Sequence, residues 1–143
     1  MRRLTDCAAL LCAVTASACT GLVAGPEVSA VTPVPASRDS AYVRARRAVQ
    51  SEAFTLDVVD SLGGHLVGTR FPSSNAQLGS ASACRVTLDL QVRGDGGNAE
   101  VAAISRWVAP GRMMDKAPQV CEGERLDVLE RITQTIVPPA VAQ

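Results

Sequence analysis

The chain has 143 residues, with 14 basic and 14 acidic side chains and one histidine, so its formal net charge is zero. A chain of this length fits one domain. The balanced charge excludes a strongly basic nucleic-acid binder and a protein that docks on membranes through a polybasic surface.

Residues 1–18 have the features of an export signal. Arg2 and Arg3 give a positive start, and an apolar stretch follows at residues 7–14. That stretch is too short to span a bilayer as a stable helix. No other segment is long and apolar enough to cross a membrane, so we expect any membrane attachment to depend on lipid alone.

The tetrapeptide Ala16-Ser17-Ala18-Cys19 resembles the lipobox of bacterial lipoproteins. The resemblance implies that the Cys19 thiol carries diacylglycerol, that the signal is cut before Cys19 and that the new amino terminus is acylated. Thr20 stands where Asp marks retention at the inner membrane in many Gram-negative lipoproteins, which implies the outer membrane, facing the periplasm. Two alternatives stay open: an ordinary secretory signal with an Ala-x-Ala cleavage site, and an uncleaved segment.

The rest of the chain divides into three parts. Residues 19–37 are rich in Ala, Val, Pro and Gly without periodicity, and we expect the lipidated cysteine to be followed there by a flexible tether. As a coil, such a tether reaches about 25 Å. Residues 38–137 are expected to form a single domain, and residues 138–143 a disordered tail.

The first predicted element of the domain is a helix over residues 41–49, preceded by N-cap residues at 37–40. Period-two alternation at 54–58, turn residues at 60–64 and a second apolar run at 66–70 predict a hairpin. Residues 72–83 have no periodicity and are expected to form a mobile loop.

The clearest alternation in the sequence lies at residues 85–93, followed by turn residues at 94–98 and a returning strand at 100–108. An apolar stripe predicts a second helix from Pro118 to about Thr135. We therefore expect a two-layer α+β fold in the order αββββα. Its antiparallel sheet of about four strands would be covered on one face by the N-terminal and C-terminal helices.

The five cysteines divide according to the predicted signal. Cys7 and Cys12 leave with it and Cys19 carries lipid, so Cys84 and Cys121 remain. In an oxidising compartment we expect these two to form a disulfide that closes a loop of about 38 residues. Two buried free thiols, a metal site and a catalytic thiol are the alternatives.

Few residues suggest catalysis. His65 is the only histidine, the residue type that most often acts as a general base near neutral pH, and we interpret it as an exposed turn residue. Gly63 and Gly64 are interpreted as a hairpin turn and not as part of a nucleotide loop, and the polar residues at 95–100 as a hairpin turn and not as a calcium site. We therefore predict no catalytic residue, no metal site and no cofactor, and identify no small-molecule substrate.

A contact with a protein partner is expected where large apolar side chains continue from a strand into a loop. Trp107, Arg112, Met113 and Met114 form this candidate partner contact, although a place in the core is favoured for Trp107. The hypothesis is a non-catalytic, lipid-anchored envelope lipoprotein that binds or scaffolds another envelope component and does not bind nucleic acid. The alternative is a small periplasmic enzyme or inhibitor that acts through the 71–83 loop.

Overall fold

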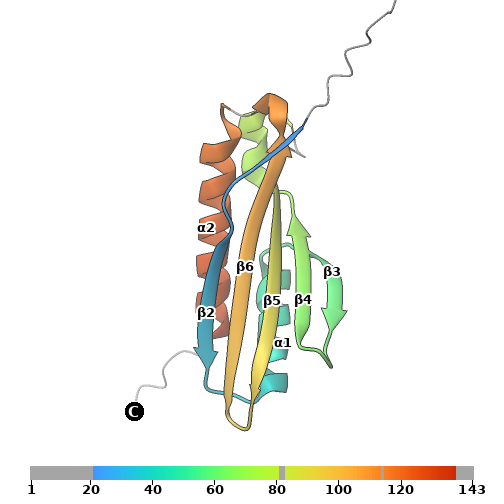
Figure 1. Cartoon of the computed structure of the whole chain (residues 1–143), viewed down its shortest axis with the longest axis vertical. Coiled ribbons are helices and arrows are strands. Elements are labelled where there is room, and N and C mark those ends of the chain that lie inside the picture. Colours follow the sequence, from blue (N-terminus) through green and yellow to red (C-terminus); the bar gives the residue numbers. More distant parts are fainter. Residues whose placement is uncertain (1–20, 81–82, 114, 138–143) are drawn as a thin grey trace, which may run out of the picture.

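The computed structural model describes residues 21–80, 83–113 and 115–137 (Figure 1). The predicted signal peptide, Cys19, Met114 and the predicted tail at 138–143 lie outside these residues. In chain order the elements are β1 (Leu22–Ala24), β2 (Val28–Val34), α1 (Arg38–Ser51), β3 (Thr55–Asp60), β4 (His65–Arg70), the 3-10 helix η1 (Ser73–Leu78), β5 (Arg85–Asp95), β6 (Asn98–Pro110), the 3-10 helix η2 (Gly111–Met113) and α2 (Ala117–Ile136).

The strands form one antiparallel sheet. β6 pairs with β5 on one side and with β1 and β2 on the other, and β4 and β3 follow beyond β5. Both α-helices pack on one face, where each contacts β5 and β6. The predicted α+β class with helices before and after the hairpins is confirmed, but the sheet has six strands in the described chain instead of about four.

The two additional strands come from the segment that the sequence predicts as a tether. β2 pairs with β6 in the register that places Val28 opposite Ser105, and β1 continues along the end of β6. The prediction of a flexible tether is therefore wrong for residues 22–34. Pro33 hides the strand signal, yet β2 lies at the sheet edge, where a missing N–H does not interrupt the ladder. Its partner strand lies far along the chain, so no local pattern marks it.

A single core lies between the sheet and the helices. The small-residue face of α1 and the apolar stripe of α2 are buried as predicted. None of the described helices is both long and apolar enough to cross a bilayer. The inward-facing side chains of the central strands complete this core, and they are Val86, Leu88, Leu90, Val92, Val101, Ala103 and Trp107.

Gly94 lies at a position of the β5–β6 hairpin where a side chain does not fit. Gly94 has a φ of +115°, and a Cβ added there would lie 2.4 Å from the carbonyl oxygen of Asn98. We expect Gly94→Ala to lower the free energy of unfolding by about 1–3 kcal/mol in urea denaturation. Gly97→Ala is the matched control, since a Cβ there meets no atom within 4 Å. Equal losses in both variants would contradict this explanation.

A charged cluster joins α1, β4 and α2. Arg131 of α2 donates to both carboxylate oxygens of Glu52 at 2.9–3.0 Å, and Arg70 of β4 donates to the same carboxylate at 3.2 Å. The hydrogen bonds from Arg131, followed by the charges of Arg131 and Arg70, lower the pKa of Glu52 although burial opposes them. Glu52 therefore stays ionised in the folded protein at a pH where it takes up a proton in the unfolded chain.

This lowered pKa predicts a pH-dependent stability. The contribution of Glu52 to stability is present above its unfolded pKa of 4.5 and is lost as the pH falls below that value and through the lower pKa of the folded protein. We expect Glu52→Gln to lose about 1 kcal/mol at neutral pH and to approach the wild type in acid. Thermal unfolding over a pH series checks this, and two parallel pH profiles would argue against it.

Candidate functional site

Segments that are distant in sequence meet at one end of the molecule. β1, η1, η2 and the start of α2 come together at the top of Figure 1, and we call this part the upper end. The backbone N–H of Gly111 donates to the carbonyl of Gly21 at 2.6 Å. The described chain therefore enters the fold at the upper end, beside the C-terminal end of β6.

The segment predicted to be a mobile loop is held in place at the upper end. It contains η1, which ends at Gly79 with a φ of +73°. The buried side chain of Asn75 accepts a hydrogen bond from the N–H of Cys84 at 2.8 Å and donates to the Cys84 carbonyl at 2.9 Å. The prediction of an irregular loop is thus wrong for residues 73–78, because a buried amide far from any periodic pattern fixes this helix on β5.

Cys84 and Cys121 meet in the core beneath η1. The structure holds them as two free, buried thiols that share a hydrogen bond, so the predicted disulfide is not formed here although the predicted proximity is confirmed. Burial raises the pKa of both thiols. Such thiols are protonated at neutral pH, which makes them poor nucleophiles and poor metal ligands in this state.

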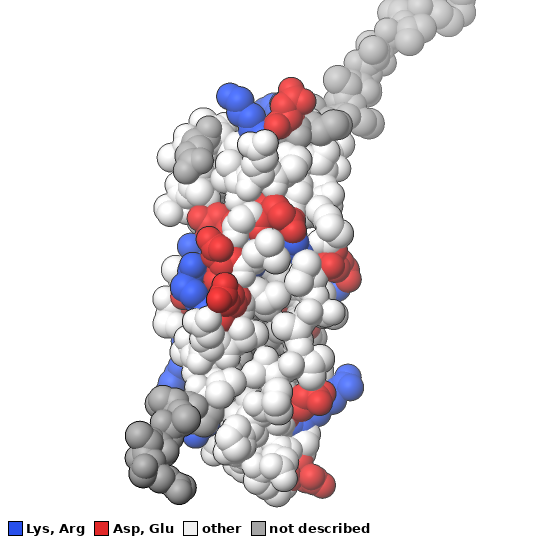
Figure 2. All heavy atoms as spheres, turned by 90° about the vertical axis from the view of Figure 1, so that its left-hand side faces the viewer, with Lys and Arg blue, Asp and Glu red and all other residues white. Residues whose placement is uncertain are grey.

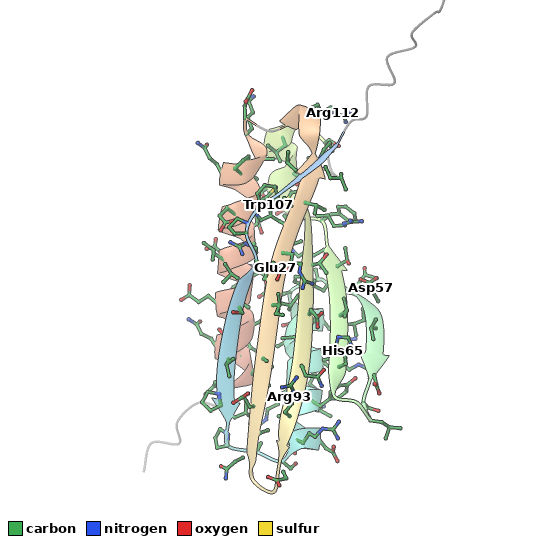
Figure 3. The ribbon with its side chains drawn as sticks, viewed as in Figure 1. Glu27, Asp57, His65, Arg93, Trp107 and Arg112 are labelled. Atoms are coloured by element: carbon green, nitrogen blue, oxygen red, sulfur yellow. The ribbon has the colours of Figure 1, made fainter. Side chains whose placement is uncertain are left out.

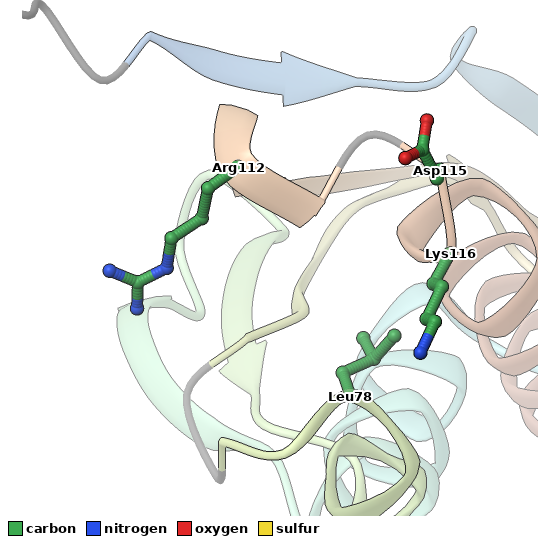
Figure 4. Close-up of a pocket in the computed structure, with 4 residues that line it drawn as sticks. All are labelled: Leu78, Arg112, Asp115 and Lys116. Atoms are coloured by element: carbon green, nitrogen blue, oxygen red, sulfur yellow. The ribbon is translucent and has the colours of Figure 1, made fainter.

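Charged side chains surround a hollow of about 310 Å³ at the upper end. Arg112, Asp115 and Lys116 line it together with Leu78 of η1. Figure 4 shows the Lys116 side chain pointing toward Leu78, while Arg112 extends outward from η2. Within the described ranges none of these three charged groups forms an ion pair. Two unpaired cations against one carboxylate give this hollow a net positive charge.

Exposed apolar side chains lie beside these charges. Leu22 of β1 is 67% exposed and Phe71 is 54% exposed, and both line one hollow of about 160 Å³ with Arg85. A further hollow of about 620 Å³ follows residues 71–80 and is lined by neutral Phe, Pro, Ser, Asn, Ala and Gly side chains. Among the side chains that the structure describes, this lining contains no acid or base.

Trp107 is not an exposed contact residue. It is 3% exposed, and Gly25 between β1 and β2 lies so close to the indole that a Cβ there would clash with it. Its Nε1 donates to Glu122 of α2 at 2.8 Å. Trp107 therefore lies in the core, the position that the sequence favours for it, and the segment interpreted as a tether folds over it. Arg112 is exposed. The Met113 side chain and Met114 lie outside the described residues.

Arg125 is a structural residue whose place on the inner stripe of α2 follows from the sequence but whose partners do not. It is fully buried on the inner stripe of α2 and donates to the carbonyls of Pro26 at 2.9 Å and Ser105 at 3.5 Å. It also forms an ion pair with Glu122, the residue that accepts from Trp107. The available signal was its position on an otherwise apolar stripe, since a buried arginine needs partners.

Polar pairs occupy the outer face of the sheet, opposite the helices. His65 Nε2 lies 2.9 Å from Asp89 Oδ1, and Thr69 donates to Asp57 at 2.5 Å. Figure 3 shows His65 and Asp57 on neighbouring strands, well away from Arg112 at the upper end. No group of three or more metal-ligating side chains occurs among the residues that the structure describes. The interpretation of His65 as a turn residue is wrong, because His65 is the first residue of β4 and its side chain pairs with Asp89 on β5.

The side of the molecule that carries α2 and β2 has a mixed surface. Figure 2 shows acidic side chains gathered at mid-height on this side, with basic side chains next to them. The visible surface is thus not a basic patch of the kind that binds nucleic acid.

No family model and no curated protein matches the chain. Among solved structures, a point mutant of norcoclaurine synthase from Thalictrum flavum in complex with a transition-state analogue has a TM-score of 0.52 at 8% identity, covering 81% of this chain and 96% of that one. Ara h 8.0201 has a TM-score of 0.46 at 8% identity, covering 81% of this chain and 98% of that chain. A DUF4468 family protein from Bacteroides ovatus has a TM-score of 0.42 at 14% identity, covering 82% and 89%. The first likeness concerns the fold alone, and the other two carry no argument.

Proposed function

We propose that this protein is a lipid-anchored envelope lipoprotein whose domain has a non-catalytic binding or scaffolding role. The observation that carries the proposal is the lipobox-like tetrapeptide at 16–19, which stands directly before the folded domain. Only Thr20 separates Cys19 from Gly21, whose carbonyl already bonds within the fold. By the same resemblance, Thr20 favours the outer membrane, with the domain facing the periplasm.

The roles of the titratable groups support a non-catalytic domain. His65 pairs with Asp89, Glu52 with two arginines and Glu122 with Arg125 and Trp107. Each of these groups joins two elements of the fold, and none faces a hollow together with a nucleophile. Catalysis requires reactive groups that converge on a substrate position, whereas these pairs diverge over three faces of the domain.

Mass spectrometry of the protein purified from its native membrane tests the anchor. We expect a chain that begins at Cys19, lacks residues 1–18 and carries the mass of acyl chains on Cys19. Cys19→Ser should move the protein from the membrane fraction to the soluble fraction. Thr20→Asp is the control for sorting and should keep the lipid while shifting the protein to the inner membrane. An unacylated mature chain in the membrane fraction would overturn the anchor.

Photo-crosslinking in the intact envelope tests the binding role. A photoreactive residue replaces Val31 at the sheet edge, Leu126 on α2 or Leu62 in the β3–β4 turn, all of which are exposed. We expect one of these surfaces to give a single adduct of constant mass while the other two do not. Equal labelling from all three, or none from any, would count against a specific partner.

A further inference from the structure

We propose that the upper end of the domain rests against the bilayer that carries the anchor, so that the membrane surface itself is a binding partner of this end. The inference rests on the proposed function, because it takes Cys19 as the attachment point. It goes further in assigning an orientation and a contact surface. Four observations lead to it.

The first observation is the short connection between anchor and domain. Gly21 is bonded to Gly111 at the upper end, and Leu22 already pairs with Pro110 in the sheet. Cys19 and Thr20 together span at most about 7 Å. A tether of residues 19–37 would have held the domain clear of the headgroups, but residues 22–34 are strands. The upper end must therefore lie within one headgroup layer of an anchor on Cys19.

The second observation is the apolar surface at this end. Leu22 and Phe71 are both more than half exposed and line the same hollow. Two large apolar side chains beside each other in water are unfavourable, whereas at an interface they can enter the boundary between headgroups and acyl chains.

The third observation is the charge around these apolar groups. Arg112 and Lys116 are exposed at the hollow, and Arg85 lines the neighbouring one, against the single carboxylate of Asp115. Cations next to a membrane are attracted by anionic phospholipid headgroups. Three cations are too few to hold a protein at a membrane without a lipid anchor, but they favour one orientation of a protein that is already anchored.

The fourth observation is the rigidity of the contact surface. Asn75 fixes η1 on β5 with two hydrogen bonds, and the Cys84–Cys121 contact joins β5 to α2 beneath it. The long axis of the domain runs from the upper end to the β5–β6 turn (Figure 1). The bound domain would thus stand on its upper end, with that turn farthest from the bilayer and the outer face of the sheet free.

The experiment uses the two phenylalanines of the mature, acylated chain as reporters. Fluorophenylalanine labels Phe71 at the upper end and Phe54 in the core, which is the internal control. In nanodiscs of phosphatidylethanolamine and phosphatidylglycerol with a nitroxide high on the acyl chain, we expect the fluorine signal of Phe71 to lose most of its intensity. Phe54, and a third reporter created by Leu62→Phe in the β3–β4 turn, should keep theirs.

Charge variants test the headgroup contact. The double variant Arg112→Glu, Lys116→Glu should restore much of the Phe71 signal in discs with phosphatidylglycerol. The matched double variant Arg47→Glu, Arg93→Glu changes the same charge at two exposed positions and should leave the signal quenched. Arg47 belongs to α1, which lies in the lower half of Figure 1, and Figure 3 shows Arg93 well below the upper end. Equal effects of the two double variants would overturn the assigned contact.

A second anchor separates this inference from the proposed function. If the native protein carries no acyl chain on Cys19, the proposed function fails, but a chain produced from Cys19 onward can be coupled through that thiol to a maleimide lipid. Loss of the Phe71 signal in this preparation still supports the contact surface. The inference is overturned if Phe71 keeps its signal with both anchors while a water-borne gadolinium chelate broadens it.

Discussion

Arg125→Ala is expected to lower the free energy of unfolding by about 3–5 kcal/mol, because it leaves the partners of a buried charge unpaired and creates a cavity. Arg125 is fully buried, and burial lowers the pKa of its guanidinium, which nevertheless stays protonated. The carbonyl of Pro26 and the carboxylate of Glu122 would lose their donor. Urea denaturation measures the loss, and hydrogen exchange should show β1 and β2 opening first.

One further variant separates packing from hydrogen bonding at this position, and a second is a control elsewhere on α2. Arg125→Met keeps most of the volume and removes an Nε that has no hydrogen-bond partner among the described residues, so we expect a smaller loss than in Arg125→Ala. Arg131→Ala changes a 46% exposed arginine on the same helix and should cost no more than about 1 kcal/mol. A loss in Arg125→Ala as small as in Arg131→Ala would show that the buried cluster does not hold the edge strands.

Oxidation of Cys84 and Cys121 to a disulfide is expected to raise the free energy of unfolding by about 4 kcal/mol, since the bridge would close a loop of about 38 residues in the unfolded chain. In this step each thiol loses its proton, two electrons pass to the disulfide of a thiol–disulfide oxidoreductase, and that enzyme leaves as a dithiol. The two thiols already share a hydrogen bond in the core. Thermal unfolding with and without reductant measures the difference.

The burial of the thiols predicts when the bridge forms. Because burial raises the pKa of both, the folded protein contains little thiolate, and oxidation should be much faster during refolding than after folding. The double variant Cys84→Ala, Cys121→Ala is the control and should not respond to reductant. A wild-type melting temperature that is the same with and without reductant, after refolding under oxidising conditions, would show that the thiols do not join.

Local periodicity predicted the elements whose own side chains carry the signal. The alternation from Val86 to Val92 marks one buried and one exposed face of β5, and the stripe from Cys121 to Ile136 marks the inner side of α2. The small-residue face of α1 was equally visible. Each of these patterns lies within one continuous segment. Burial of one face gives the apolar residues a period of two in a strand and of about 3.6 in a helix.

The candidate site was only partly predictable. Arg112 was identified as an exposed contact residue, but the hollow that it forms with Lys116 and Leu78 joins three segments of the chain. Leu22 and Phe71 carried no signal, since a single exposed apolar residue has no pattern. The environment of Trp107 was missed because its cover, the bend at Gly25, was assigned to a tether.

The α+β class, the two hairpins, both amphipathic helices and the proximity of Cys84 and Cys121 all follow from the spacing of apolar side chains along the chain. The two edge strands, η1 and the partners of Arg125 become visible only in the folded molecule. These features depend on groups far along the chain, as in the hydrogen bond from Arg125 to Pro26 across 99 positions. An edge strand is stabilised by the ladder of its neighbour, and a buried arginine by its acceptors, so neither leaves a periodic mark in its own segment.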